Sequence, residues 1–380
     1  MALTPDERDE LRSTARGVLA RSCSPERVRA VVADEDSTDR QLWEQIVELG
    51  WTSIHVDEAI GGGGCGHADL AVVVHELGRA LAPTPFLASA VLATGALALA
   101  DGDSDAHALL TGLVEGRSIG TVAFASTSGS YDLARLTTGW VAEGDGLQLS
   151  GSAGFVLDAD LADVVVVAAR DEHGRIAVVA LDDLAGVVIE RVPTVDETRR
   201  LFTLHVDGVV VPSSRLLCEP GATTERLLDQ VLALGVVAAT GDAAGAAEHA
   251  LETTAEYARE RLQFGKPIGS FQAVKHHCAN MAIAVESSRA AVRAAAAALD
   301  GEPSGWAEAA AIAASYVGPA CSEACALELR VHGGIGFTWE HDTHLHLKRT
   351  KLDEVLFGTP AWHRRRLADA VFPRIVGAAS

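Results

Sequence analysis

The chain has 380 residues, 48% of them hydrophobic, which is enough to bury the cores of two or three domains. Its 31 basic and 52 acidic residues give a formal net charge of −21, which disfavours nucleic-acid binding but is compatible with a local basic site for one small phosphorylated ligand. The polar start of the chain is unlike a signal peptide, and apolar runs such as "LASAVLATGALALA" are too short to span a membrane. We therefore expect a cytoplasmic protein that has no membrane segment.

Residues 1–117 are predicted to form an N-terminal helical domain. Apolar residues recur at three- and four-residue spacing in "ERDELRSTARGVLARS" and "RQLWEQIVELGW", which is typical of amphipathic helices. The stretch "GGGGCGHADL" interrupts this pattern with a loop whose glycines are free to adopt positive φ. Because no βαβ strand precedes these glycines, a phosphate-binding role for them is weakly supported.

Residues 118–219 are predicted to form a small β-barrel or sandwich. Short β-rich runs such as "ADVVVVAAR", "RIAVVAL" and "LFTLHVDGVVVP" are separated by turn sequences such as "EGDG" and "DEHG". Residues 220–380 return to long, Ala-rich helical patterns that suit close packing in a four-helix bundle. The predicted fold class is therefore α+β and mostly α, with helical, β and bundle domains in that order.

No metal site is predicted. The six cysteines contain no CxxC pair and are expected to be reduced, mostly buried thiols. In "HGGIGFTWEHDTHLHLKR", His344 and His346 are two residues apart on a predicted helix, so their side chains diverge by about 200°. Asp342 is expected to cap the start of that helix with its carboxylate.

Three stretches carry a resemblance to a known family. "YARERLQFGKPIGSFQAVKHHCANM" resembles the helix-loop-helix signature of the acyl-CoA dehydrogenases, "VHGGIGFTWEHD" resembles their Gly-Gly loop, and "HADLAVVVHELGRALAPTPFL" resembles their N-terminal helical region. The form "GFTWEHDTHLHLKR" is similar to an actinobacterial branch associated with sterol and steroid side-chain degradation. The resemblance implies an FAD-dependent oxidoreductase that desaturates the Cα–Cβ bond of an acyl-CoA thioester, with a carboxylate as base.

The same resemblance implies a set of cofactor-binding residues. Arg261 would reach the FAD pyrophosphate across a subunit interface, since its planar fork grips phosphate bidentately. Phe264 would pack on the cofactor, Gln272 would lie nearby, and the backbone at Gly333 and Gly334 would approach the adenosine portion. Taken singly, Arg261 is better explained as a surface charge and the glycines as a helix cap. Their shared order and spacing favour the cofactor interpretation.

Two further candidates complete the cofactor set. Thr359 matches the Gly-Thr pair that follows the catalytic Glu in many members of the family. Arg330 stands where the family usually has a Gln before the Gly-Gly loop.

The catalytic base is missing from both positions where the family carries it. Counting without gaps places Phe357 at one position and Gly235 at the other, and neither residue can accept a proton. Glu354 lies about one helical turn before Phe357, a displacement of ~5 Å, which makes it a weak substitute.

The flavin-facing part of the β zone also departs from the family. "TVAFASTSGSYD" lacks the acidic residue and proline of the usual turn, and Phe155, Val156 and Leu157 replace a Trp-Ile-Thr segment whose Thr bonds the flavin ring edge.

These departures suggest the subunit without a catalytic base in an α2β2 heterotetramer, completing an FAD site and fold for a homologous catalytic chain. The alternatives are a self-sufficient homotetrameric dehydrogenase that uses Glu354, or a non-enzymatic scaffold or acyl-CoA-binding homologue. A flavin monooxygenase on the same fold is a fourth and weaker alternative.

Overall fold

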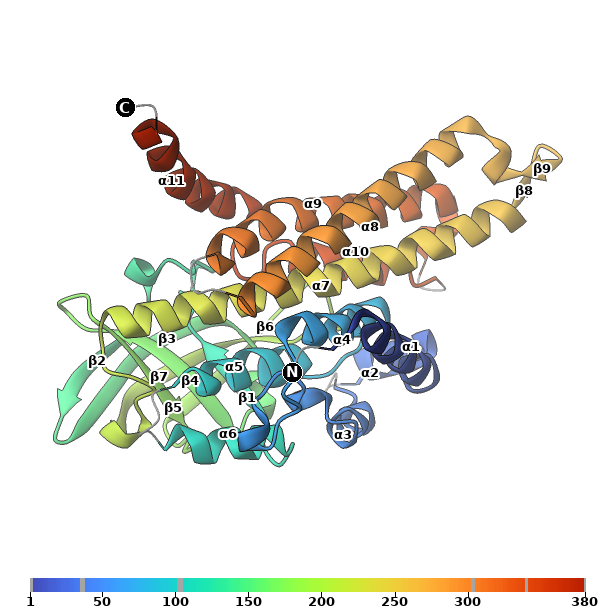
Figure 1. Ribbon diagram of the computed structural model, residues 1–380. Helices are drawn as coiled ribbons and strands as arrows, with labels where there is room; N and C mark the ends of the chain where they lie inside the picture. The colour runs from blue at the N-terminus through green and yellow to red at the C-terminus, as the bar shows by residue number, and fades with distance from the viewer. Residues whose placement is uncertain (1–2, 35–37, 101–104, 302–304, 339–340, 379–380) are drawn as a thin grey trace. The chain divides into compact units, whose positions relative to one another are not determined.

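The computed structural model describes residues 3–34, 38–100, 105–301, 305–338 and 341–378. The chain divides into two compact units (Figure 1). One contains Asp36–Gly66 and Pro83–Gly235, and the other contains Leu3–Glu35, His67–Ala82 and Val236–Ser380. The predicted three-domain division (1–117, 118–219 and 220–380) stays a prediction.

The first unit combines short helices with one seven-stranded sheet. Its helices are α3 (Arg40–Glu48), the π-helix η3 (Leu87–Ala93), α5 (Thr94–Ala98) and α6 (Ala106–Val114). Its strands are β1 (Gly120–Ala123), β2 (Thr138–Glu143), β3 (Gly146–Leu157), β4 (Val164–Arg170), β5 (Ile176–Leu181), β6 (Val187–Val192) and β7 (Leu201–Pro212). The strand order is β1-β4-β2-β3-β7-β6, with β5 paired to β4.

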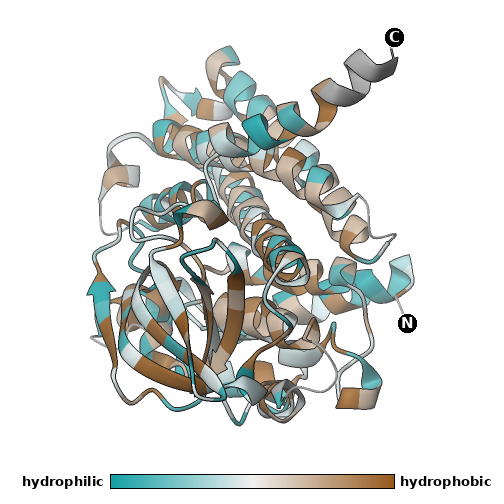
Figure 2. Ribbon diagram, turned by 90° about the vertical axis from the view of Figure 1, so that its left-hand side faces the viewer, coloured by the Kyte–Doolittle hydropathy of each residue, from teal (hydrophilic) through white to brown (hydrophobic). Residues whose placement is uncertain are grey.

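Burial explains the two kinds of strand sequence in this sheet. Every residue of β5 and all but the last of β4 are buried, so both read as continuous apolar runs. Strand β7 is buried or half-buried in its first half and mostly exposed in its second half. Bands of hydrophobic and hydrophilic residues are visible along the strands in Figure 2. The three β-rich runs quoted from the sequence are strands β4, β5 and β7. Strand β2 has no comparable apolar run, because only its first half is buried.

The second unit is helical. It contains α1 (Pro5–Ser22), α2 (Pro25–Val32), α4 (His67–Arg79), α8 (Gln272–Leu299), α9 (Trp306–His332), α10 (Thr343–Asp353) and α11 (Pro360–Ala378), together with α7 (Ala222–Glu260) from Val236 onward. The hairpin of β8 (Leu262–Gln263) and β9 (Lys266–Pro267) joins α7 to α8.

Short 3-10 helices occur in both units among the residues described. They are η1 (Trp51–Ser53), η2 (Glu58–Ile60), η4 (Leu133–Arg135), η5 (Ala159–Leu161), η6 (Ser213–Arg215), η7 (Ile268–Ser270) and η8 (Gly333–Phe337).

Glycines set the close approach of α4 to α7. A Cβ atom added at Gly78 would lie 2.2 Å from the backbone oxygen of Asp242, and one added at Gly245 would lie 1.9 Å from that of His75. Larger residues would force the two helices apart. The small residues of α7 therefore serve close helix packing, as their Ala-rich context predicted.

Two helical stretches, Ala222–Glu260 and Trp306–Phe337, are long and apolar enough to cross a membrane by length and composition alone. The most apolar windows of these stretches are 89% and 61% buried inside the chain, as in the core helices of a bundle. These two helical stretches, of 39 and 32 residues, are longer than the apolar runs considered in the sequence.

Candidate functional site

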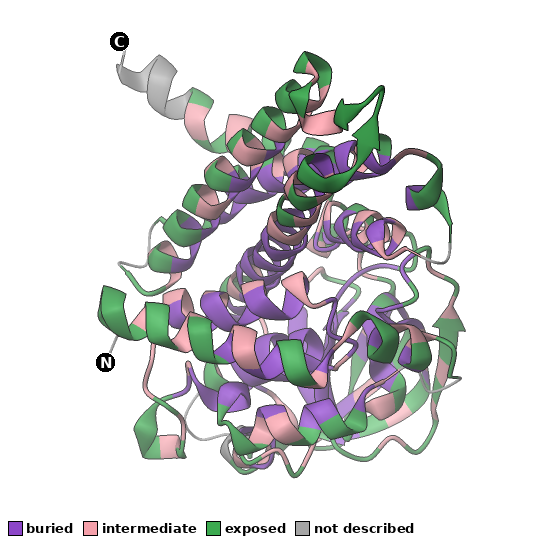
Figure 3. Cartoon of the chain, turned by 90° about the vertical axis from the view of Figure 1, so that its right-hand side faces the viewer, coloured by how far each residue is buried: buried purple, intermediate pink, exposed green. Residues whose placement is uncertain are grey.

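The first predicted cofactor segment projects from the bundle. The β8–β9 hairpin extends beyond the ends of α7 and α8 (Figure 1), and Figure 3 colours it as exposed. The amide of Arg261 donates to the carbonyl of Tyr257 at 2.9 Å, which continues the end of α7. Phe264 occupies the turn at a φ of 53° and is 90% exposed, and Gln272 is exposed at the start of α8. These side chains are available to a ligand or another chain.

The second predicted segment follows α9. Gly333 adopts a φ of 67°, and a Cβ atom at Gly333 or Gly334 would meet nothing within 4 Å, so a ligand can approach this backbone closely. Ile335 and Phe337 of the same turn are 45% and 71% exposed. An open backbone flanked by exposed apolar side chains is suited to the flat face of a cofactor or to a partner surface.

The last two candidates are also at the surface. Arg330 is exposed and pairs with Glu323 at 3.3 Å, and Thr359 is exposed at the turn before α11. Both side chains are accessible, but nothing among the described residues directs them to the Gly-Gly turn.

A ring stack joins the two cofactor segments. The Tyr257 ring lies 4.3 Å from the imidazole of His332, with 22° between the planes. The imidazole also donates from Nδ1 to the carbonyl of Glu328 at 2.9 Å. Tyr257 lies one turn before the hairpin and His332 immediately precedes Gly333, so the stack sets the distance between the two segments. No local sequence pattern predicted this pairing, because it is a contact between α7 and α9.

Neither of the two positions at which the resemblance places a catalytic base holds a carboxylate. Phe357 is 2% exposed and adopts a φ of 64°, in the turn between α10 and α11. A bulky residue in this conformation costs about 1–3 kcal/mol. His363 stabilises the turn by donating a hydrogen bond from Nε2 to the Phe357 carbonyl at 3.0 Å. Burial lowers the pKa of His363 to about 4, so this imidazole is neutral at pH 7. Gly235 is buried within α7.

Glu354 is engaged in local structure. Its Oε2 accepts from Ser322 Oγ at 2.8 Å and from Lys351 Nζ at 2.9 Å. The carboxylate is thus directed to α9 and to a cation on its own helix. Neither contact prepares it to remove a proton from carbon, which needs a base with a free acceptor near the substrate.

In the first unit, the loop that replaces the family's flavin turn bonds to itself. The amide of Ser126 donates to Ser130 O at 2.9 Å, and the amide of Ser130 donates back to Ser126 Oγ at 3.0 Å. The amide of Gly129 donates to Ser126 O, and that of Thr127 donates to Thr137 Oγ1. Four of the five backbone amides of residues 126–130 are therefore already used, three of them within the loop itself, which leaves few backbone donors to hold a flavin ring edge.

The three residues of the replaced Trp-Ile-Thr segment face different ways. Phe155 is 36% exposed at a φ of 54°, and its ring would lie 3.1 Å from a Cβ atom at Gly129. Val156 and Leu157 are buried in the core of the sheet unit. None of the three offers a polar group to a flavin.

Two histidines after the Gly-Gly turn, His341 and His346, pack on other imidazole rings. His332 lies 4.6 Å from His341, and His346 stacks on His249 of α7 at 4.6 Å. No group of three or more potential ligands could hold a metal among the residues described. The prediction that the Asp342 carboxylate caps α10 is wrong: Asp342 is at the N-cap, but its side chain pairs with Arg29 of α2 and makes no capping bond.

The donor set fits one part of FAD better than another. An exposed guanidinium, an exposed phenyl ring and an open Gly-Gly backbone in the bundle unit suit a dinucleotide's phosphates and adenosine. The internally bonded loop and the apolar segment of the sheet unit do not suit the isoalloxazine ring.

Comparisons with known proteins identify the family of the chain. Sequence profiles described as "Acyl-CoA dehydrogenase, N-terminal domain" and "Acyl-CoA dehydrogenase, C-terminal domain" match residues 5–116 and 227–372. Acyl-CoA dehydrogenase IpdE2 of Mycobacterium tuberculosis is 34% identical over 371 residues, which cover 97% of this chain and 98% of that protein. Acyl-CoA dehydrogenase FadE34 of the same organism is 33% identical, over 96% of this chain but 48% of its own length.

Two solved structures are similar over nearly the whole chain. A variant of the Tcur3481-Tcur3483 steroid ACAD superposes with a TM-score of 0.87 at 30% identity and covers 99% of both chains. The ChsE4-ChsE5 complex from Mycobacterium tuberculosis superposes with a TM-score of 0.86 at 28% identity and covers 97% of this chain and 98% of its counterpart.

Proposed function

Because the chain belongs to the acyl-CoA dehydrogenase family, we propose that it is the subunit without a catalytic base in a heterotetrameric FAD-dependent acyl-CoA dehydrogenase. The observation that carries the proposal is Phe357, a buried phenylalanine at the position where a catalytic glutamate is expected. The reaction would be the α,β-desaturation of an acyl-CoA thioester, and its base would belong to a homologous partner chain.

The proposed contribution of this chain is to bind and position. When bound, FAD supplies the hydride acceptor of the reaction. Arg261 would neutralise its pyrophosphate, Phe264 would cover an apolar face, and the Gly333–Gly334 backbone would approach the adenosine. Gln272, Arg330 and Thr359 would complete the polar surroundings. Placement in an interface would also exclude water from these contacts, which strengthens charge-assisted hydrogen bonds.

The known proteins support a paired assembly. One structural neighbour is a complex of two named chains, ChsE4 and ChsE5, and another is the paired Tcur3481-Tcur3483 steroid ACAD. In FadE34 the matching segment makes up 48% of the protein, which leaves room for a second segment of similar length. These relatives also favour a steroid CoA ester as the substrate, in agreement with the resemblance of the "GFTWEHDTHLHLKR" stretch.

Expression with and without a dehydrogenase-like partner encoded beside it tests the proposal. We expect the chain alone to bind less than stoichiometric flavin and to leave acyl-CoA unoxidised, and the co-purified pair to do both. Full flavin occupancy and robust oxidation by the chain alone would instead favour a homotetramer that uses Glu354. A pair that forms but contains no flavin would favour a non-enzymatic scaffold or acyl-CoA-binding homologue.

A further inference from the structure

Two helices of the bundle unit each carry a pair of arginines four residues apart. Arg8 and Arg12 lie on α1, and Arg289 and Arg293 lie on α8. Residues at this spacing share one face of a helix, and like charges there destabilise the helix by about 0.2–0.5 kcal/mol per pair. The two pairs therefore concentrate positive charge locally in a chain whose formal net charge is −21.

The two arginine pairs line one cavity. It has a volume of about 240 Å³, and α4 supplies its third wall, including His75. Between the arginines are small apolar side chains, among them Ala71, Val72 and Val292. No acidic residue is among the described residues that line this cavity. We call it the arginine cavity.

The partners of the four arginines leave much of this charge uncompensated. Arg8 pairs at 2.5 Å with Asp69, which is fully buried. Within their own helices, Arg12 and Arg289 pair with Asp9 and Glu286, which are 73% and 70% exposed, so each of these pairs contributes only about 0–1 kcal/mol. Arg289 also lies 3.8 Å from Glu248, a carboxylate that it shares with His75 and Arg16. Arg293 is exposed and forms no ion pair with any residue described.

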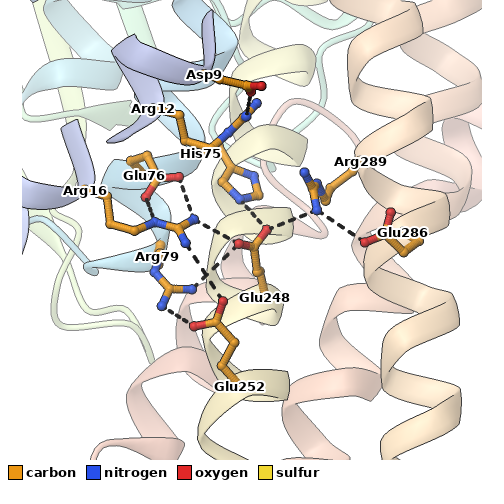
Figure 4. Close-up of polar contacts among 10 residues, drawn as sticks. All are labelled: Asp9, Arg12, Arg16, His75, Glu76, Arg79, Glu248, Glu252, Glu286 and Arg289. Atoms are coloured by element: carbon orange, nitrogen blue, oxygen red, sulfur yellow. Dashed lines mark hydrogen bonds and ion pairs between the residues drawn. The ribbon is translucent and has the colours of Figure 1, made fainter. Parts of the chain in front are cut away.

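Glu248 of α7 holds the inner wall of the arginine cavity in place. Its carboxylate contacts His75 Nε2 at 3.0 Å and lies 3.8 Å from Arg289, and Arg16 contacts its other oxygen at 2.9 Å (Figure 4). Burial raises the pKa of Glu248, but the hydrogen bonds from His75 and Arg16 and the charge of Arg289 outweigh it and lower the pKa overall. Glu248 therefore remains ionised and fixes side chains from three other helices, which makes the cavity wall preorganised.

We propose that the arginine cavity binds a small phosphorylated molecule with at least two negative charges. Guanidinium groups grip phosphate oxygens bidentately, which favours phosphate over a simple point charge. Two opposed pairs can be bridged by a dianion, whereas a monocarboxylate would satisfy one pair. The volume admits only a small ligand, and the Ala and Val side chains accommodate an apolar portion of it.

Calorimetric titration of the purified full-length chain with inorganic pyrophosphate tests this site. We expect saturable binding that weakens as salt is raised, because charge attraction drives it. The double variant Arg12→Gln/Arg293→Gln should weaken binding by about tenfold or more, since it removes two charge-assisted contacts. A matched control, Arg117→Gln/Arg135→Gln, removes two exposed arginines outside the cavity and should bind as the unmodified chain does.

Three results would overturn the proposal: no measurable pyrophosphate binding, equal affinities of the two double variants, or acetate binding as tight as pyrophosphate binding. Arg12→Lys/Arg293→Lys retains the charge and removes the planar fork, so an intermediate affinity separates a fold defect from loss of the site. Titration with ADP beside pyrophosphate distinguishes the ligand's source, and only the ADP binding that Arg12→Gln/Arg293→Gln weakens is assigned to the arginine cavity rather than to the Arg261 hairpin. Within that part, tighter ADP binding means that the Ala and Val side chains of the cavity hold an organic group, and equal binding means that the inorganic anion suffices. None of these readouts depends on flavin or on a partner chain.

Discussion

The ring of Tyr257 lies 4.3 Å from that of His332, and this stack connects the end of α7 to the Gly-Gly turn. Each residue stands next to a segment that we assign to the same cofactor. Burial lowers the pKa of His332, so the imidazole is neutral at pH 7. Its Nδ1–H donates a hydrogen bond to the Glu328 carbonyl of α9 while its face packs on tyrosine. The relative position of two cofactor segments thus depends on a contact that involves neither of them directly.

Replacing His332 should lower flavin retention by the co-purified pair. We expect His332→Ala to reduce bound flavin several-fold, because the stack and the Nδ1 hydrogen bond are both lost. Tyr257→Phe keeps the ring and should retain normal occupancy, whereas Tyr257→Ala should resemble His332→Ala. Flavin absorbance per protein, beside circular dichroism, measures the effect; normal occupancy in both alanine variants would contradict the positioning role.

Restoring a glutamate at the missing base position should not restore activity. Phe357→Glu places an unpaired carboxylate at a site that is 2% exposed, and we expect the free energy of unfolding to fall by about 3 kcal/mol or more. Phe357→Leu is the size control and should cost less. Acyl-CoA-dependent bleaching of flavin in the Glu variant purified alone would contradict our assignment, because the sheet unit would then support the flavin ring after all.

Glu354→Gln distinguishes a base from a structural carboxylate. The amide can still accept from Ser322, and the lost pair with Lys351 is partly exposed, so stability should change by no more than about 0.5–1 kcal/mol. Oxidation by the assembled pair should be unchanged. A drop in turnover of a hundredfold or more, with the fold intact, would assign Glu354 as the base.

A buried ion pair connects α10 to α7. Arg349 Nη1 lies 3.1 and 3.2 Å from the two oxygens of Asp242, and the side chains are 2% and 5% exposed. Arg349→Met leaves Asp242 charged in the core and should lower the free energy of unfolding by about 3–5 kcal/mol. The double variant Asp242→Asn/Arg349→Met should recover part of this loss. Urea denaturation of the three variants measures it, and a double variant no better than the single one would point to other partners of Arg349.

Stability should fall on the alkaline side because of Glu328. Burial raises its pKa to about 8, against the hydrogen bond that Thr253 donates at 2.8 Å. The folded protein therefore holds this proton more tightly than the unfolded chain, so the stabilisation is complete below about pH 4.5 and is lost as pH rises through 8. Glu328→Gln removes this titration, and its urea midpoint should decline less between pH 5 and 8.5 than that of the unmodified chain.

Two histidines act in the opposite direction on the acid side. Burial lowers the pKa of both His249 and His363 to about 4, below the value of 6.5 expected in the unfolded chain. Their contribution to stability is present above pH 6.5 and is lost as pH falls through 4, by on the order of 3 kcal/mol each. His363→Gln should flatten this acid limb; an unchanged acid limb would mean that His363 is already protonated in the fold.

Local patterns predicted the elements but not the contacts among them. Continuous valines identified β4, and Ala-rich spacing identified α7 through α9, since these patterns follow directly from burial on both faces or on one helical stripe. The capping role assigned to Asp342 failed because Arg29, more than 300 positions away, competes for its carboxylate.

The candidate site shows the same division. Phe357 and Gly235 could be found by counting along one chain, because the family spacing is fixed. The stack of Tyr257 on His332 and the arginine cavity depend on which helix faces meet. Arg8 and Arg289 are separated by 281 positions in sequence, and no local pattern connects them.

The exposed ring of Phe264 bears on how much of this chain can be made relative to a partner chain. This ring is 90% exposed on a projecting turn and is held at a positive φ, so it is both strained and wetted in the free chain. If a partner chain covers the Phe264 ring, the two chains must be made in equal amounts to stay soluble. Copies of this chain without a partner would expose the same ring to one another. Overproduction of this chain alone would then lead to self-association, and the yield of monodisperse protein would follow the dose of its partner.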